Sequence, residues 1–139
     1  MDYDEVFAPV AKHATIRYIL SMAANPKAYL AQLDVSTAFL NGIVEEELYC
    51  TQPPGFEQDH RVCRMWKCLY GLKQASRQWH LKVKDDMTAI GFREVDVDQG
   101  LFILPNSAKK PIIWVLLWVD DFLMLSFDKS SKTSTRTPS

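Results

Sequence analysis

Two adjacent carboxylates, Asp120 and Asp121, stand in the middle of the most apolar stretch of the chain, PIIWVLLWVDDFLML at residues 111–125. A membrane-spanning helix needs roughly 20 apolar residues, and one Asp at its centre costs about 2.5 to 3.5 kcal/mol. The stretch is shorter than such a helix and holds two Asp residues at its centre, so we expect the chain to have no membrane partner. The apolar segments on both sides are short and rich in Ile, Val, Trp and Phe, which is typical of β-strands. The stretch therefore predicts a β-hairpin with its turn centred on the two carboxylates.

A third carboxylate, Asp34, lies at the end of another predicted strand. In AYLAQLDV, residues 28–35, apolar side chains recur at every second position, which is the period of a strand. If this strand lies beside the hairpin, Asp34, Asp120 and Asp121 converge at one end of a sheet. Such a cluster binds Mg²⁺, and two ions can assist the attacking and leaving oxygens of a phosphoryl transfer. Two other interpretations stay open: a solvated turn for the pair, and an Asp34 that accepts hydrogen bonds from backbone amides.

The remaining pattern predicts one α+β domain over residues 1–127. With 47% hydrophobic residues among 139, such a chain buries roughly two thirds of its unfolded surface. We expect one helix capped by Thr15 and another that is capped by Ser76 and stopped by Gly91. Residues 128–139 are mostly Ser, Thr and Lys, so we expect a disordered tail. The further expected strands lie near residues 48–51, 62–69 and 101–104.

Basic residues gather in the middle of the chain, although the net charge is only −1. Residues 61–84 contain seven Lys or Arg and no Asp or Glu, with Trp and Tyr residues between them. Cations that neutralise phosphates, beside aromatic faces that stack on bases, are typical of nucleic-acid surfaces. Lys73 and Arg77 flank the predicted N-terminus of a helix, where anions are favoured. The alternative is a solvated helix face with Trp79 in the core.

Three cysteines, Cys50, Cys63 and Cys68, form no CxxC pair, and no signal peptide precedes them. A zinc site that also used His60 would have a spacing that matches no common site. The pattern favours reduced thiols in an intracellular setting.

Six short motifs occur in one order along the chain. They are LDVSTAFLNG, QPPGF, LYGLKQASRQW, GF, DQGLF and WVDD. Together with FAPVAKHATIRYIL they resemble the reverse transcriptase domain of copia-type LTR retrotransposon polyproteins, from Phe7 to about Met124. The resemblance implies the palm and part of the fingers of a polymerase, with a palm-like antiparallel sheet, helices packed on one face and no thumb.

The resemblance also implies an activity, RNA-directed DNA polymerisation. Asp34 matches the carboxylate of the first catalytic motif of this family, and Asp120 and Asp121 match those of the third. They would hold two Mg²⁺ ions, with Mn²⁺ as an alternative. The primer 3′-hydroxyl would then attack the α-phosphate of a dNTP, and pyrophosphate would leave. The implied partners are an RNA template, a DNA primer and dNTPs.

Further positions are carried over from the same motifs. Phe39 matches the residue that excludes ribonucleotides at the sugar 2′ side, and Tyr70 and Gly71 match a segment that packs against the incoming nucleotide. This chain departs from the family at two positions, because Trp118 replaces the usual Tyr before VDD and Ser76 replaces a Pro. The residues expected to contact template, primer or phosphate are Lys73, Gln74, Arg77 and Trp118.

The family context implies a larger Pol polyprotein with integrase and ribonuclease H domains, which serves DNA integration. We therefore expect this chain to be a fragment of a transposable element, located in a cytoplasmic virus-like particle or in the nucleus. Two alternatives remain: an inactive remnant or domesticated module that binds nucleic acid, and a two-metal nuclease that uses the same carboxylates. Product length separates the nuclease from the polymerase, because a polymerase lengthens a primer.

Overall fold

The computed structural model describes residues 8–105 and 113–127. The chain folds into two compact units. We call Thr37–Lys82 the hairpin unit, and Pro9–Ser36 with the described part of Val83–Ser139 the sheet unit. The turn PNSAKK and the predicted tail at 128–139 lie outside the described residues, apart from Pro105.

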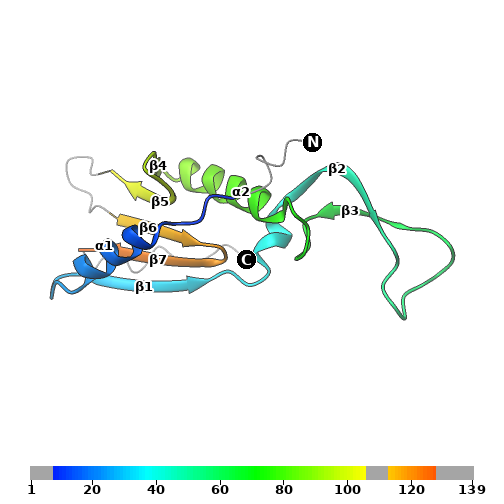
Figure 1. Cartoon of the computed structure of the whole chain (residues 1–139), viewed down its shortest axis with the longest axis horizontal. Helices are drawn as coiled ribbons and strands as arrows, with labels where there is room; N and C mark the ends of the chain where they lie inside the picture. The colour runs from blue at the N-terminus through cyan, green and yellow to red at the C-terminus, as the bar shows by residue number, and fades with distance from the viewer. Residues whose placement is uncertain (1–7, 106–112, 128–139) are drawn as a thin grey trace. The chain divides into compact units, whose positions relative to one another are not determined.

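The sheet unit is built on a five-stranded antiparallel sheet in the order β1-β7-β6-β5-β4 (Figure 1). The strand β1, from the early part of the chain, pairs with the last strand, β7. The predicted strands are confirmed, but β4 was missed because three residues are too few to show alternation. The bounds are β1 (Tyr29–Asp34), β4 (Arg93–Val95), β5 (Asp98–Leu104), β6 (Ile113–Trp118) and β7 (Asp121–Ser126).

A helix covers one face of this sheet. Helix α1 (His13–Ala23) presents Ile19 to that face, where its side chain is fully buried. On the other face, Val115 and Met124 line a groove together with the end of helix α2 (Ala75–Ala89). The end of α2 therefore lines a groove on this second face. The core around α1 consists of Ala11, Ile19, Leu101, Leu116 and Leu125.

The N-terminus of α1 is held by a carboxylate from β5. Asp98 is 4% exposed, and its side chain accepts hydrogen bonds from the Lys12 backbone N–H at 2.9 Å, from the Gly100 N–H at 3.0 Å and from the Thr15 hydroxyl. The helix begins two residues before Thr15, with Lys12 at the cap position. The predicted Thr15 cap is therefore wrong, since a distant acid supplies the acceptor that a local Thr usually provides.

The hairpin unit contains a two-stranded antiparallel sheet of β2 (Ile43–Cys50) and β3 (Cys63–Lys67). A short 3-10 helix, η2 (Ala38–Asn41), precedes β2. Both predicted strands are confirmed, although β2 begins earlier than expected. The small core of the hairpin unit consists of Val44, Cys68 and Ala75.

Helix α2 begins in the hairpin unit and ends in the sheet unit, because the boundary between the units falls after Lys82. It starts at Ala75, so Ser76 lies inside the first turn and is not the N-cap that was predicted. Its end agrees with the prediction, because Gly91 has a φ of +97°, a conformation that glycine adopts readily.

The predicted α+β class with an antiparallel sheet is confirmed. None of the helices within residues 8–105 and 113–127 combines the length and the apolar character of a membrane-spanning segment.

Candidate active site

The strand register places two of the three predicted catalytic carboxylates opposite each other. Asp34, the last residue of β1, pairs directly with Asp121, the first residue of β7. Directly opposed residues of an antiparallel pair point to the same face, with their Cβ atoms about 4.5–5.5 Å apart. This pairing confirms the expectation that the strand ending in Asp34 lies beside the hairpin.

The third carboxylate, Asp120, lies in the turn between β6 and β7. Trp118 pairs with Asp121, so the turn consists of Val119 and Asp120 and is one residue earlier than predicted. Val119 has a φ of 58°, because two-residue hairpin turns need a left-handed residue to match the twist of their strands. The Val35 N–H donates to the Asp120 carbonyl at 3.0 Å. The backbone of the turn is therefore tied to the residue that follows Asp34.

Gln32 supplies a polar contact to this site that the sequence prediction missed. Its side-chain Nε2 donates to Oδ1 of Asp121 at 3.1 Å. The alternation of β1 places Gln32 on the same face as Asp34, and this spacing was the signal that could have identified it. The amide leaves the second carboxylate oxygen of Asp121 available to another partner.

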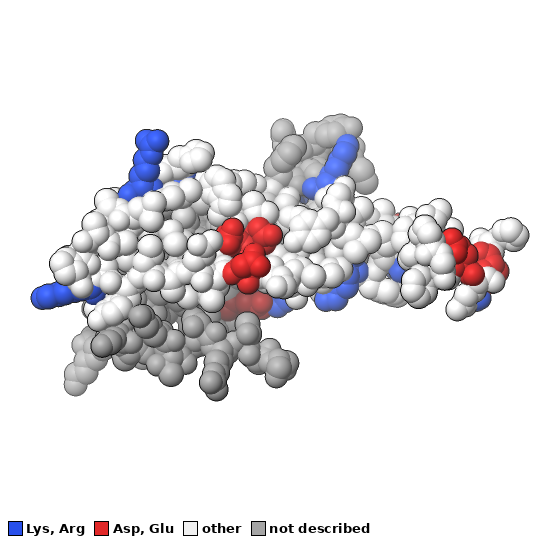
Figure 2. All heavy atoms as spheres, turned by 90° about the horizontal axis from the view of Figure 1, so that it is seen from below, with Lys and Arg blue, Asp and Glu red and all other residues white. Residues whose placement is uncertain are grey.

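Figure 2 shows a group of acidic side chains near the middle of the drawn face, with uncharged atoms along most of its border. Asp120 and Asp121 are half-buried, and Asp34 is exposed. Because opposed like charges destabilise a strand pair, this end of the sheet favours a cation.

The donor chemistry fits a divalent ion such as Mg²⁺, which prefers carboxylate oxygens and keeps several waters. Within the described ranges, no group of three or more His, Cys, Asp or Glu side chains is arranged to hold a metal. Two carboxylates on one face are nevertheless enough, because Mg²⁺ commonly binds one or two of them together with substrate phosphates.

Trp118 lies on the same face as Asp121, its cross-strand partner. Its ring is half-buried, with a centroid 5.5 Å from that of His13 on α1 and a tilt of 49°. The ring also packs against the core of the sheet unit. Through these contacts Trp118 helps to fix α1 on the sheet, beside the carboxylates.

The residues predicted for nucleotide selection meet in the hairpin unit. The rings of Phe39 and Tyr70 are 4.4 Å apart at their centroids and tilted by 45°. Phe39 is half-buried on η2, whereas Tyr70 is 57% exposed. Gly71 follows with a φ of +98°, a conformation that residues with a Cβ rarely adopt.

One of the predicted phosphate contacts, Gln74, is held by a protein partner. Gln74 donates from Nε2 to Oε2 of Glu46 at 2.9 Å. Lys73 is exposed, and Arg77 is half-buried in the first turn of α2. Sequence spacing could not reveal the partner of Gln74, because Glu46 comes from a different strand.

Acidic residues also neutralise part of the basic segment. Arg64 pairs with Glu47 at 3.3 Å, and Arg61 pairs with Asp59 at 2.5 Å. The guanidinium carbon of Arg64 also lies 4.3 Å from the centroid of the Trp66 ring, a cation–π contact. One face of the hairpin thus combines a cation with an exposed aromatic ring.

Comparison with known proteins gives a family match over most of the chain. The profile described as "Reverse transcriptase (RNA-dependent DNA polymerase)" matches residues 1–135. The "Retrovirus-related Pol polyprotein from transposon TNT 1-94" of Nicotiana tabacum is 46% identical over 132 residues, which are 93% of this chain and 10% of that polyprotein.

Two further relatives extend the similarity. The "Retrovirus-related Pol polyprotein from transposon RE1" of Arabidopsis thaliana is 40% identical over 131 residues, 92% of this chain and 9% of that protein. The "Transposon Ty1-GR3 Gag-Pol polyprotein" of Saccharomyces cerevisiae is 32% identical over 120 residues, 86% of this chain and 6% of that protein. The chain thus spans about a tenth or less of these relatives. No solved structure matches it.

Proposed function

The chain belongs to the reverse transcriptase (RNA-dependent DNA polymerase) family, and on that premise we propose that it supplies the catalytic carboxylates of a copia-type retrotransposon polymerase. The observation that carries this proposal is the pairing of Asp34 with Asp121 across β1 and β7. Two segments far apart in the sequence thereby present carboxylates to one face. The proposed reaction extends a DNA primer on an RNA template.

Although the described side chains form no ready-made metal site of three carboxylates, Asp34, Asp120 and Asp121 would hold two Mg²⁺ ions, or Mn²⁺ in their place, together with substrate phosphates. When bound, these ions supply electrostatic stabilisation to the attacking and leaving oxygens of the transfer. The strands contribute position: the ladder between β1 and β7 holds the backbone of Asp34 and Asp121, and the hydrogen bond from the Val35 N–H holds the backbone of Asp120. In the proposed reaction the primer 3′-hydroxyl attacks the α-phosphate of a dNTP, and pyrophosphate leaves.

Phe39 is proposed to exclude ribonucleotides by collision with a sugar 2′-hydroxyl. Its contact with the Tyr70 ring supports this role, because a ring held by a neighbour cannot swing aside to admit the extra hydroxyl. Gly71 would let the nucleotide approach the backbone closely, because it has no Cβ and the space that a Cβ would face is open, with no atom within 4 Å.

Template and primer are proposed to lie against the basic and aromatic residues. Lys73 and Arg77, near the start of α2, suit phosphates because helix N-termini favour anions. Gln74 and Trp118 are the other two proposed contacts. The exposed ring of Trp66, 65% accessible, offers a stacking surface for an unpaired base.

The named relatives are polyproteins, so we propose that this chain acts as part of one. Its partners there would be integrase and ribonuclease H domains, and its location a cytoplasmic virus-like particle or the nucleus.

Primer extension on an RNA template tests the proposal. The assay would compare the chain alone with the chain joined to the flanking regions of the Nicotiana tabacum relative, using Mg²⁺ and dNTPs. In the joined protein, Asp34→Asn and Asp121→Asn should each lower extension by about 100-fold or more, the scale of losing one transition-state stabiliser.

The matched control is Asp85→Asn, which changes an exposed carboxylate on α2 and should leave extension unchanged. Full extension by the Asp34→Asn or Asp121→Asn variant would refute the catalytic assignment. Shortening of the primer would instead identify a nuclease.

The second candidate function is nucleic-acid binding without catalysis. It is favoured by the exposed cation–aromatic contact of Arg64 and Trp66. Binding of labelled primer–template that survives Asp121→Asn but falls with Trp66→Ala, together with no extension by the joined protein, would support it.

A further inference from the structure

Two cysteines face each other across the hairpin unit. Cys50 is the last residue of β2, Cys63 is the first residue of β3, and the register pairs them directly. The same alternation places Leu48 and Met65 on their side of the ribbon, and these two residues are half-buried. The two thiols therefore share one face at the open end of the two-stranded sheet.

The geometry of such a pair suits a disulfide. Directly opposed residues in antiparallel strands have Cα atoms about 4.5 or 5.5 Å apart, depending on their place in the hydrogen-bond ladder. Disulfides span Cα separations of about 4.4 to 6.8 Å. Both ladder positions fall within this range, so a bond between Cys50 and Cys63 requires only a small adjustment of side chains.

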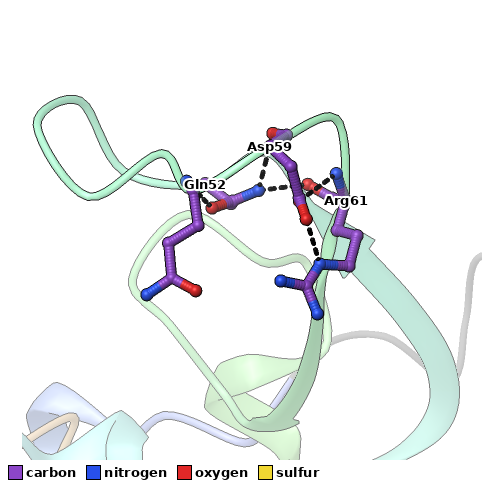
Figure 3. A network of polar contacts seen from close by, with 4 residues as sticks. Gln52, Asp59 and Arg61 are labelled. Carbon is purple, nitrogen blue, oxygen red and sulfur yellow. Dashed lines mark hydrogen bonds and ion pairs between the residues drawn. The ribbon is translucent and has the colours of Figure 1, made fainter.

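A polar network holds the two chain segments together immediately beyond the cysteines (Figure 3). The side chain of Gln52 donates to the Asp59 carbonyl at 3.1 Å and to the Arg61 carbonyl at 2.6 Å. Arg61 in turn pairs with the Asp59 carboxylate. The strand ends that carry the thiols are thus restrained from both sides, by the ladder and by this network.

We propose that Cys50 and Cys63 are a redox-sensitive pair that closes a reversible cross-strand disulfide at the base of the loop 51–62. The co-reactant is a low-molecular-weight disulfide such as oxidised glutathione. The exposed Cys63 thiolate attacks one of its sulfurs and releases one glutathione thiol. The Cys50 thiolate then attacks the Cys63 sulfur of the mixed disulfide and releases the second. Two protein thiols lose two electrons and two protons, and one glutathione disulfide becomes two thiols.

The third cysteine has a different environment. Cys68 is fully buried, and its Sγ lies 3.8 Å from the Ile43 carbonyl oxygen. Burial, and secondarily the charge of Glu46, raise the pKa of the Cys68 thiol. Since the thiolate is the reactive form, this cysteine should stay inert.

Closing the bond would make a ring of the loop that carries Phe56, whose side chain is 76% exposed. The loop could then no longer separate from the strands that anchor it. This inference concerns the hairpin unit alone and does not depend on polymerase activity.

The test is thiol mapping of the whole chain in a glutathione redox buffer, by intact mass and by peptide mass spectrometry after trapping of free thiols. We expect the protein to lose the mass of two hydrogen atoms and to yield a Cys50–Cys63 peptide, independently of protein concentration. Cys68→Ala should behave in the same way. Cys50→Ser should instead accumulate a stable glutathione adduct on Cys63.

A register control makes the test specific. In Cys63→Ser combined with Arg64→Cys, the thiol moves by one residue and therefore to the opposite face, so no bond to Cys50 should form. Persistent glutathione adducts on the unaltered chain, an intermolecular product, or equal cross-linking in the register control would overturn the proposal.

Discussion

At the scale of single residues, the hydrogen bond from Gln32 to Asp121 has a definite chemical meaning. A neutral donor fixes one carboxylate oxygen without competing for a cation. In the proposed site Asp121 is a metal ligand, and removing a group that supports such a ligand commonly costs about 10- to 100-fold in metal affinity.

We therefore predict that Gln32→Ala weakens Mn²⁺ binding by about 10-fold, the lower end of the effect of such supporting groups. Isothermal titration calorimetry with Mn²⁺ measures this directly. The control is Gln99→Ala, an exposed amide on β5 of the same sheet. If Gln32→Ala binds Mn²⁺ as tightly as Gln99→Ala does, the supporting role is refuted.

Asp98 is the other residue whose role the structure defines. Its buried carboxylate accepts the Lys12 and Gly100 N–H groups and the Thr15 hydroxyl. Removing the acceptor leaves one buried donor, the Gly100 N–H, and two partly buried donors without this partner, so Asp98→Ala should lower the free energy of unfolding by about 2–3 kcal/mol. Urea unfolding measures this change. Asp96→Ala, an exposed acid two residues earlier, should change stability little, and equal losses in the two variants would contradict the capping role.

At the scale of elements, the turn that presents Asp120 contains a strained residue. Val119 holds a φ of 58°, where a β-branched side chain is unfavourable. Val119→Gly should therefore raise the free energy of unfolding by about 1 kcal/mol. The matched control is Val97→Gly. Val97 is 73% exposed and does not have a positive φ, so this change should lower the free energy of unfolding or leave it unchanged. Thermal unfolding of the two variants decides the prediction, and loss of stability in Val119→Gly would contradict it.

The same elements show what sequence could and could not predict. Alternation along 28–35 was enough to predict β1, and short runs rich in Ile, Val, Trp and Phe within 111–125 were enough to predict β6 and β7, because period and composition are local properties. The one-residue shift of the turn was not predictable in this way, since the pairing of Trp118 with Asp121 is fixed by both strands together. Likewise, the cap of α1 comes from Asp98 on a distant strand, and no local pattern points to it.

At the scale of the whole molecule, the net charge of −1 conceals an uneven distribution. The acidic residues near the end of β1 lie in the sheet unit, and most of the basic segment 61–84 lies in the hairpin unit. Lys73 and Arg77 were predicted as phosphate contacts from their charge and from their place near a helix N-terminus, and the family motifs added Gln74 and Trp118. The structure adds ion pairs such as Arg64–Glu47, which reduce the positive charge that such a segment offers to phosphates.

The pairing of β1 with β7 has a consequence for how the protein is made. The strand that ends in Asp34 is synthesised early, but its hydrogen-bonding partner ends at Ser126. Contacts between segments so distant in sequence form slowly, because the intervening chain loses much entropy when they close. On the ribosome, the backbone groups of β1 must wait, bonded only to water, until β7 emerges. The facing carboxylates are therefore among the last features to assemble, and synthesis that stops before β7 leaves an unpaired strand that is prone to aggregation.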